Sequence, residues 1–473
     1  MKPQEPISSL FLKSAFTEEG SFISTQEVIK WIVKQNENTT VKITKIPFSD
    51  LKFWEFDESN LRHSSGQFFS IDGIRIKTNW GSIHEWEQPI IFQNEVGYLG
   101  FITKEFNGVL HFLVQAKIEP GNINHVQLSP TLQATRSNYN QVHKGKKPLY
   151  LDYFLRAVPT QILLDQLQSE QGARFLKKRN RNIIIKIEED IPVYENFIWI
   201  TLAQIKKLMQ YNNIVNMDTR TVVSGILLEA KGKTSTDYLN SSSHKRDEGS
   251  VISLFLKSSL SHRREMHTIE EIITFLTQLK STYDLDVTKI PLKSIKNWIF
   301  SESEIFHIDK KYFKVIAADV EIGNREVVAW SQPMIQPEGE GLCAFICKEI
   351  NGLLHFAVQA KLECGNQDII EFAPTVQCLT GNYKYPDWNL PFLDYVINAK
   401  KDQIIFDSML SEEGGRFFRE QNRNLIVFAK DEIPVELPPN FIWMTLNQLF
   451  TFIKFNNYLN IQARSLISSI SFV

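Results

Sequence analysis

The chain of 473 residues is poor in cysteine, and its first half has none. All four cysteines lie in the second half, as Cys343, Cys347, Cys364 and Cys378. The chain repeats itself at an offset of 244 residues, and this offset aligns the cysteines with Leu99, Thr103, Pro120 and Ala134. Because the same fold is then built with and without thiols, we expect these cysteines to be small buried side chains, with no zinc or disulfide framework.

Other features are absent as well. The net charge is −2 and no block of like charge occurs, which argues against nucleic acid or membrane as a partner. No apolar run reaches the roughly 20 residues that span a bilayer, and the first residues carry no apolar signal region. We expect a soluble, cytoplasmic protein. The sequence also has no Walker loop, dinucleotide fingerprint, His-Glu-x-x-His motif or nucleophile elbow.

What the sequence does contain is a long internal repeat. Residues 107–117 return at 351–361 with nine of eleven positions identical, and the offset of 244 recurs elsewhere along the chain. A solenoid unit runs to roughly 20–50 residues, so this period indicates a duplicated domain. We predict a first repeat over 6–228, an exposed Ser-rich linker over 229–249 and a second repeat over 250–473.

Both repeats show the same predicted order of elements. A helix with a threonine cap is followed by an Asn-Gly hairpin, a second helix, a strand and a capped closing helix. The first helix begins at Thr25 and Thr268, and the hairpin covers 104–110 and 348–354. The second helix covers 161–167 and 403–409, the strand covers 182–187 and 424–429, and the closing helix begins at Thr201 and Thr445. Helices mixed with hairpins predict an α+β fold, in which a mixed sheet is flanked by helices.

The strand after the hairpin carries an unusual polar face. Alternation places Gln115, Lys117 and Glu119 on one side of it. The second repeat keeps the pattern as Gln359, Lys361 and Glu363. One interpretation is a solvent-facing strand with a weak Lys–Glu pair. The other is the wall of a site, in which Gln holds a hydroxyl, Lys an anion or enolate, and Glu moves a proton.

A second polar segment covers residues 129–139 and returns at 373–383. Its shared polar residues are Thr131, Gln133, Asn138 and Tyr139, with the counterparts Thr375, Gln377, Asn382 and Tyr383. Thr135 and Arg136 are replaced by Leu379 and Thr380, which indicates that the repeats are unequal. Closely spaced donors and an arginine suit a phosphate or a sugar, although Pro-Thr and Ser-Asn-Tyr also form turns.

A third segment is basic and covers residues 170–182 and 412–424. Its shared residues are Arg174 and Arg416, Arg181 and Arg423, and Asn182 and Asn424. These arginines could hold a diphosphate through bidentate hydrogen bonds. Alternatively, basic residues at a helix end would complement the helix dipole.

Four segments taken together resemble the NDP-hexose 2,3-dehydratase family, namely 114–122, 129–139, 178–182 and 215–222. The resemblance covers nearly the whole chain. It implies that dTDP-4-keto-6-deoxy-D-glucose loses its C2 hydroxyl in deoxysugar biosynthesis, and that a downstream 3-ketoreductase captures the 3,4-diketo product. It also implies a homodimer of Nudix-like repeats. The chemistry needs no metal or other cofactor, and we expect none.

The resemblance also suggests roles for individual residues. Lys117 would contact the enolate or substrate oxygen, and Glu119 or Tyr139 would transfer a proton. Sugar hydroxyls would be held by Gln115, Thr131, Gln133 and Asn138, and the diphosphate by Arg136, Arg174 and Arg181. The remaining substrate-binding candidates are Asn122, Thr135 and Asn182 in the first repeat and Gln359, Lys361, Glu363, Thr375, Gln377, Asn382, Arg416 and Arg423 in the second.

Two other functions stay open at this point. The first is a noncatalytic protein that only binds a nucleotide sugar. The second is a Nudix-type hydrolase, for which Glu170-Gln-Gly-Ala and Glu412-Glu-Gly-Gly would be relics of the Nudix box. The upstream glycine and the Arg-Glu pair of that box are missing, so we expect magnesium-dependent pyrophosphate hydrolysis to be lost.

Overall fold

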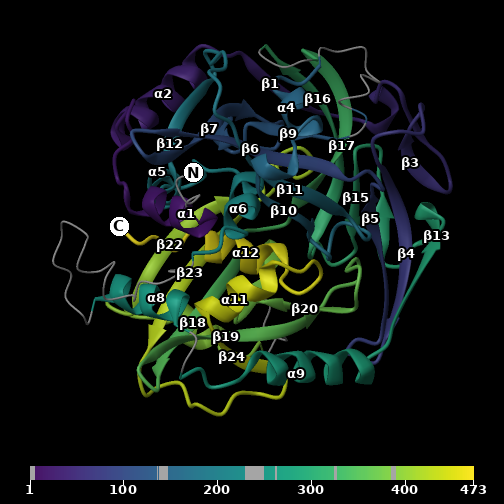
Figure 1. Ribbon diagram of the computed structural model, residues 1–473. Coiled ribbons are helices and arrows are strands. Elements are labelled where there is room, and N and C mark those ends of the chain that lie inside the picture. The colour runs from purple at the N-terminus through teal and green to yellow at the C-terminus, as the bar shows by residue number, and fades with distance from the viewer. Residues whose placement is uncertain are drawn as a thin grey trace.

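The computed structural model describes residues 6–135, 137, 147–228, 250–261, 264–323, 327–384 and 390–473. The predicted linker lies outside these residues. Figure 1 shows two repeats of similar architecture, one above the other, with helices α6 (Met217–Ser224) and α12 (Ile461–Ser468) side by side between them. The predicted duplication is therefore also visible in three dimensions.

Each repeat contains a seven-stranded mixed sheet. In the first repeat the strand order is β10-β11-β6-β7-β12, with β8 paired to β7 and β9 to β6, and only β11 and β6 run parallel. These strands are β6 (Gly97–Phe106), β7 (Val109–Ile118), β8 (Val126–Ser129), β9 (Leu132–Ala134), β10 (Ile162–Ser169), β11 (Arg179–Lys186) and β12 (Phe197–Thr201).

The second repeat has the same order, β22-β23-β18-β19-β24, with β20 paired to β19 and β21 to β18. These strands are β18 (Gly341–Ile350), β19 (Leu353–Leu362), β20 (Ile370–Ala373), β21 (Val376–Cys378), β22 (Ile404–Ser411), β23 (Gln421–Ala429) and β24 (Phe441–Thr445). The predicted α+β class with mixed sheets is confirmed.

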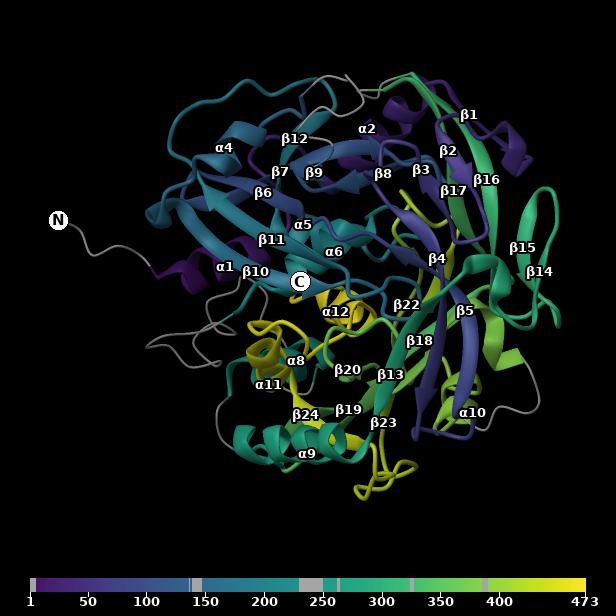
Figure 2. The ribbon, with the colours of Figure 1, turned by 90° about the vertical axis from the view of Figure 1, so that its right-hand side faces the viewer.

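Two smaller sheets exchange strands between the repeats. β1 (Val41–Ile46) of the first repeat pairs antiparallel with β16 (Phe313–Ile322) of the second. Conversely, β13 (Leu285–Ile290) of the second repeat pairs with β4 (Ser70–Thr78) of the first. Both pairs are visible in Figure 2. The other strands of these sheets are β2 (Trp54–Phe56), β3 (Asn60–His63), β5 (Glu85–Phe92), β14 (Trp298–Phe300), β15 (Glu304–His307) and β17 (Ala329–Pro337). Each small sheet is thus completed only by the other repeat.

Helices cover the large sheets. They are α1 (Ile7–Phe16), α2 (Thr25–Glu37), α4 (Leu151–Leu155), α5 (Leu202–Leu208) and α6 in the first repeat, and α8 (Val251–Leu260), α9 (Ile269–Thr282), α10 (Leu393–Ile397), α11 (Leu446–Ile453) and α12 in the second. Short 3₁₀ turns are η1 (Phe48–Asp50), η2 (Pro159–Gln161), η3 (Leu292–Ser294) and η4 (Leu379–Lys384). Within the described residues no helix is both long and apolar enough to cross a bilayer.

Three of the four predicted threonine caps are confirmed. Thr201, Thr268 and Thr445 each accept a backbone N–H three residues later and form capping boxes. The fourth prediction was one residue too late. Ser24 caps α2 through the N–H of Glu27, and Thr25 is already helical.

The predicted helices over 161–167 and 403–409 are wrong, because these residues form strands β10 and β22. Both strands pair antiparallel with their neighbours, β11 and β23. In each pair the register shifts after the first partner, between Ile162 and Leu164 and between Ile404 and Phe406. Such an irregularity interrupts the two-residue alternation by which a strand is recognised, so a short apolar run is easily mistaken for a helix.

The predicted Asn-Gly hairpins are confirmed. Asn107 and Gly108 have φ values of 52° and 75°, and Asn351 and Gly352 have 54° and 78°. Two consecutive positive φ angles fit the tight turn whose twist matches that of the flanking strands. The turns hold β6 against β7 and β18 against β19, and the polar segments follow β7 and β19 directly.

The four cysteines are buried and free, as expected for small core residues. The interior where the repeats meet is held instead by two arginines. Arg220 on α6 donates to Ser465 Oγ at 2.7 Å, to the Val215 carbonyl at 2.6 Å and to the Ser411 carbonyl. Its counterpart Arg464 donates to the carbonyls of Leu459 and Ser169. Each guanidinium therefore joins its own repeat to the other.

Candidate active site

The polar face of β7 is covered by protein. Gln115 and Lys117 are half-buried, and Glu119, just past the strand end, is only 5% exposed. The interpretation as a solvent-facing strand is therefore wrong. Glu119 Oε1 accepts a hydrogen bond of 2.6 Å from Gln133 Nε2, and Lys117 Nζ donates to the Gln133 carbonyl at 3.3 Å. The structure thus brings three of the predicted residues together.

The second repeat reproduces this arrangement closely. Gln377 Nε2 donates to Glu363 Oε1 at 2.8 Å, and Lys361 Nζ donates to the Gln377 carbonyl at 3.4 Å. Gln359 occupies the position of Gln115 and is likewise half-buried. The Lys–Glu–Gln group is therefore a frame common to both repeats.

Helix α6 adds polar groups to the first frame. Asn216 caps this helix through the N–H of Thr219, and its Nδ2 donates to Gln133 Oε1 at 3.3 Å. Two residues later, in the first helical turn, lies the carboxyl of Asp218, which is only 3% exposed. In the second repeat Asn460 makes the equivalent bond to Gln377, at 2.6 Å.

A loop of the other repeat packs against each Lys–Glu–Gln frame. Gly121 N–H donates to the Gly414 carbonyl at 2.7 Å, and a Cβ on Gly414 would lie 2.9 Å from the Glu119 Cβ and 2.1 Å from Asn122 Oδ1. Only glycine permits this approach. The loop that contains Glu413 therefore packs against Glu119. Reciprocally, Gly365 N–H donates to the Gly172 carbonyl at 2.6 Å.

The first-repeat site gathers charges of both signs. Burial raises the pKa of Asp218 well above its usual value, and the carboxylates of Glu119, Glu170 and Glu413 raise it further, whereas Lys117 opposes them. Burial and the neighbouring Glu119 raise the pKa of Glu413 to about 7. A carboxyl whose pKa lies near neutrality, such as that of Glu413, can both give and take a proton. The site can therefore carry out acid–base chemistry.

Basic side chains lie around these carboxyls. Burial lowers the pKa of Lys178 to about 8, against the attraction of Glu170. Arg416 of the second repeat interacts with Glu413 and stacks over the Phe69 ring at 4.4 Å. An anionic ligand would therefore meet positive charge here.

Arg174 of the first repeat reaches the site of the second repeat. Its guanidinium lies 4.1 Å from the centre of the Phe313 ring and interacts with Glu420 and Glu363 of the second repeat. Arg174 and Arg416 therefore each belong to the site of the other repeat, which their positions in the sequence do not reveal.

Two further predicted arginines, Arg181 and Arg423, are held in ion pairs. Arg181 binds Asp165 at 2.7 and 2.6 Å, and Arg423 binds Asp407 at 2.9 and 2.6 Å. They lie on strands β11 and β23, so the alternative of basic residues at a helix end is wrong. Their predicted contact with a diphosphate would require exchange of these partners.

Several predicted binding residues serve the fold. The Thr131 hydroxyl donates to the Leu113 carbonyl and accepts the Ile102 N–H, and Thr375 repeats both bonds with Ala357 and Ile346. Asn122 Nδ2 donates to the His125 carbonyl at 2.8 Å. Asn182 Nδ2 donates to Thr221 Oγ1 at 3.3 Å. The remaining oxygens of Asn122 and Asn182 are buried without a hydrogen-bond partner.

The predicted residues after β9 are only partly visible. The hydroxyl of Thr135 lies 3.0 Å from that of Ser137. Arg136, Asn138 and Tyr139 lie outside the described residues, as does the side chain of Asn382. Their predicted roles therefore stay predictions.

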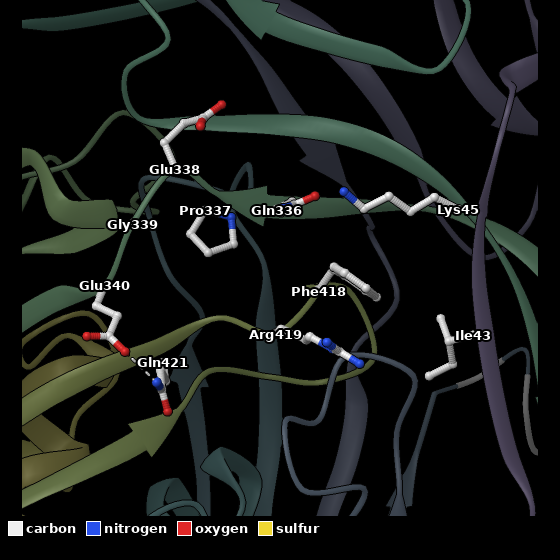
Figure 3. A pocket seen from close by; sticks show the side chains of 10 residues that line it. All are labelled: Ile43, Lys45, Gln336, Pro337, Glu338, Gly339, Glu340, Phe418, Arg419 and Gln421. Atoms are coloured by element: carbon white, nitrogen blue, oxygen red, sulfur yellow. Dashed lines mark hydrogen bonds between the residues drawn. The ribbon is translucent and has the colours of Figure 1, made fainter.

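A cavity of about 580 Å³ is lined by Ile43 and Lys45 of the first repeat and by eight residues of the second (Figure 3). Lys45, on the exchanged strand β1, and Arg419 lie 5.7 and 5.5 Å from the centre of the Phe418 ring. Arg419 and Gln421 line the cavity, and Glu420 between them is buried and interacts with Arg174. Among the described residues, no three His, Cys, Asp or Glu side chains are grouped so that they could hold a metal ion.

Sequence reasoning missed Asp218, Glu413 and Asn216 as site residues. Asn216 and Asp218 were noticed only as part of the segment 215–222, and Glu413 only in a supposed relic of the Nudix box. One signal could have found two of them, because the counterparts of Asp218 and Glu413 are the uncharged residues Gln462 and Gln171. Repeats that share a frame but differ in ionisable groups indicate a division of roles.

Comparison with known proteins identifies the family of both repeats. Residues 25–226 and 269–470 each match the NDP-hexose 2,3-dehydratase family. Three relatives are named dTDP-4-dehydro-6-deoxy-alpha-D-glucopyranose 2,3-dehydratase. The protein from Saccharopolyspora spinosa is 43% identical over 97% of this chain and 94% of its own length.

The relative from Amycolatopsis orientalis is 38% identical over 97% of this chain and 92% of its own length. The relative from Streptomyces violaceoruber is 40% identical over 93% and 95%. Both repeats and nearly the full length are therefore matched, and the chain belongs to the NDP-hexose 2,3-dehydratase family.

Proposed function

We propose that this enzyme removes the C2 hydroxyl of dTDP-4-keto-6-deoxy-D-glucose as water and yields the dTDP-3,4-diketo-2,6-dideoxyhexose. The observation that carries the proposal is the near full-length similarity to three dehydratases that are named for this substrate. Their names call the 4-keto group 4-dehydro. The buried Lys117–Glu119–Gln133 frame supports it, because such an elimination needs a positioned base and donors for an enolate oxygen.

The chemistry follows from the substrate. The C3 proton is α to the C4 ketone and is therefore acidic, and the C2 hydroxyl is β to that ketone. Removal of the C3 proton gives an enolate, which expels the C2 hydroxyl. The resulting enol then becomes the 3,4-diketone when C2 is protonated. These steps require proton transfer and charge stabilisation, which side chains alone provide.

The first repeat holds the proposed catalytic groups. The Lys117 ammonium stabilises the oxygen that becomes negative in the enolate, and the Glu119 carboxylate, oriented by Gln133, takes the C3 proton. Tyr139 is the other candidate for proton transfer. Gln115, Gln133 and Asn138 are the proposed ligands of the sugar hydroxyls.

The diphosphate requires positive charge at the edge of this site. Arg136 and Arg181 of the first repeat are the predicted ligands, and Arg416 supplies a guanidinium from the second repeat. The frame of the second repeat, with Arg174 beside it, offers a similar set of groups for nucleotide-sugar binding. We further propose a Nudix-like origin for the repeats, a homodimer in the cytoplasm, and a 3-ketoreductase that consumes the product.

Incubation of the purified enzyme with dTDP-4-keto-6-deoxyglucose tests the proposal. The product should be trapped with a diamine, which condenses with adjacent ketones, and should show by mass the loss of one water from the sugar. A noncatalytic binding protein would bind the substrate without this product. A Nudix-type hydrolase would release dTMP when magnesium is added, and either result would refute the dehydratase assignment.

A further inference from the structure

The two composite sites share their frame but not their ionisable groups. Lysine, glutamate and glutamine recur as Lys117 and Lys361, Glu119 and Glu363, and Gln133 and Gln377. Two carboxyl groups of the first site have amide counterparts in the second, where Gln462 replaces Asp218 and Gln171 replaces Glu413. An amide can hold a ligand but cannot deliver a proton at neutral pH. The difference therefore concerns proton transfer rather than shape.

Asp218 lies next to the frame of the first site. It follows the helix cap Asn216, which itself binds Gln133 of the frame at 3.3 Å. The charged groups that interact with it are Lys117 from β7, Glu119 just past the end of that strand, Glu170 from the loop after β10, and Glu413 from the other repeat. Because three of these four are carboxyls, the negative form of Asp218 is disfavoured.

Polar atoms left without partners indicate that this region receives a ligand. Glu413 Oε2 and Glu170 Oε2 are buried and have no hydrogen-bond partner, and the Glu170 residue is only 5% exposed. In the second site both amide atoms of the buried Gln462 are also unpartnered. Unpaired buried polar atoms are costly in a folded protein, and a bound polar ligand would satisfy them.

We propose that protonated Asp218 is the general acid that delivers a proton to the departing C2 hydroxyl, and that Glu413, supplied by the second repeat, is the positioning residue that keeps this proton in place. The inference rests on the proposed function and extends it, because it assigns the acid and makes the second repeat part of the catalytic centre. Burial and the surrounding carboxyls raise the pKa of Asp218 well above its usual value, which favours its protonated form.

The proton balance closes with these groups. Glu119 takes the C3 proton, the C2–O bond breaks, and the hydroxyl leaves as water with the Asp218 proton. The product at this point is an enol with a C2–C3 double bond, and the site holds protonated Glu119 and ionised Asp218. Glu119 then protonates C2 while Asp218 takes the enol O–H proton. Both carboxyls return to their starting states without any further reactant.

Asp218→Asn provides the direct test, because asparagine has the same size and cannot give up a proton. In deuterium oxide, recovered substrate should still gain deuterium at C3, as measured by NMR. Water loss should be slower by about a hundred-fold to ten-thousand-fold. Asp190→Asn, the same substitution at a fully exposed carboxyl outside the site, is the matched control and should keep both rates within a few-fold. Thermal unfolding and dTDP binding establish that each variant is intact.

Glu413→Gln tests the contribution of the second repeat. Loss of one neighbouring negative charge lowers the pKa of Asp218, so water loss should fall at neutral pH and recover at lower pH. A merely structural role of Glu413 would not shift the pH profile of water loss relative to C3 exchange.

Three outcomes would overturn the inference. They are normal water loss in Asp218→Asn, loss of both C3 exchange and water loss in a folded Asp218→Asn that still binds dTDP, and an unshifted profile in Glu413→Gln. The second outcome would make Asp218 a base. Failure of the proposed function is distinct, because the unmodified enzyme would then produce neither C3 exchange nor diketone.

Discussion

Arg220→Ala should destabilise the whole chain, because one side chain binds both repeats. The residue is 1% exposed, and its guanidinium bonds to Val215, Ser465 and Ser411, of which the last two belong to the second repeat. A hydrogen bond to a charged group contributes about 1.5–3 kcal/mol. These values are not additive, and breaking a buried charged contact costs about 3–5 kcal/mol. We expect a loss in the free energy of unfolding of this size.

The assay is chemical denaturation followed by both fluorescence and circular dichroism. At roughly 2 cal/mol/K of unfolding entropy per residue, the same loss lowers the melting temperature by about 3–5 °C for a chain of this length. Arg464→Ala should give a similar loss, since Arg464 makes the reciprocal contacts. Arg181→Ala is the control, because its pair with Asp165 is partly exposed and contributes at most about 1 kcal/mol.

A loss below about 1 kcal/mol for Arg220→Ala would refute this reasoning. So would separate unfolding transitions in the unmodified protein, because they would mean that the repeats are stable without one another. Because β1 and β13 each pair with a strand of the other repeat, we expect a single unfolding transition.

Three further predictions concern catalysis and pH. Lys117→Ala should lower turnover by about a hundred-fold to a thousand-fold, whereas Lys361→Ala should lower it less than about ten-fold; equal losses in folded variants would contradict unequal repeats. Prolonged chelation should leave turnover unchanged, and a loss that only a divalent ion restores would show that the reaction needs a metal. Burial lowers the pKa of Lys206 to about 7, far below its unfolded value. The unfolded state therefore binds more protons between about pH 7 and 10.4, and stability should rise with pH across that window. Lys206→Met should lack this rise in denaturation measured across the same pH range.

The sequence by itself determined a large part of this protein. The period of 244 revealed the duplication, because two copies of one fold keep the same core and turn residues. The Asn-Gly hairpins and three threonine caps were predictable, since each depends on local backbone geometry. Alternation along the strand predicted that Lys117 and Glu119 lie on one side, because a strand has a period of two, and both contact Gln133 in the structure.

Prediction failed where the pattern was short or interrupted. The apolar runs after Gln161 and Gln403 are strands, whose irregular register hides their alternation. The sequence alone also did not show that the arginines of the basic segment have different partners. Arg181 is bound by Asp165 across neighbouring strands, whereas Arg174 reaches the second repeat, and both occur in the same basic segment.

Only the tertiary structure decided what makes up the site. Gly414 lies against Glu119 although 295 positions separate them, because glycine lets the two backbones meet across the repeat interface. That contact brings Glu413 to the first site, and the reciprocal contact of Gly172 with Glu363 brings Arg174 to the second. Burial and neighbouring charges from both repeats then raise the pKa of Asp218. Sequence fixes which groups are present, whereas long-range packing determines which of them share one low-dielectric site, and hence which can hold or move a proton.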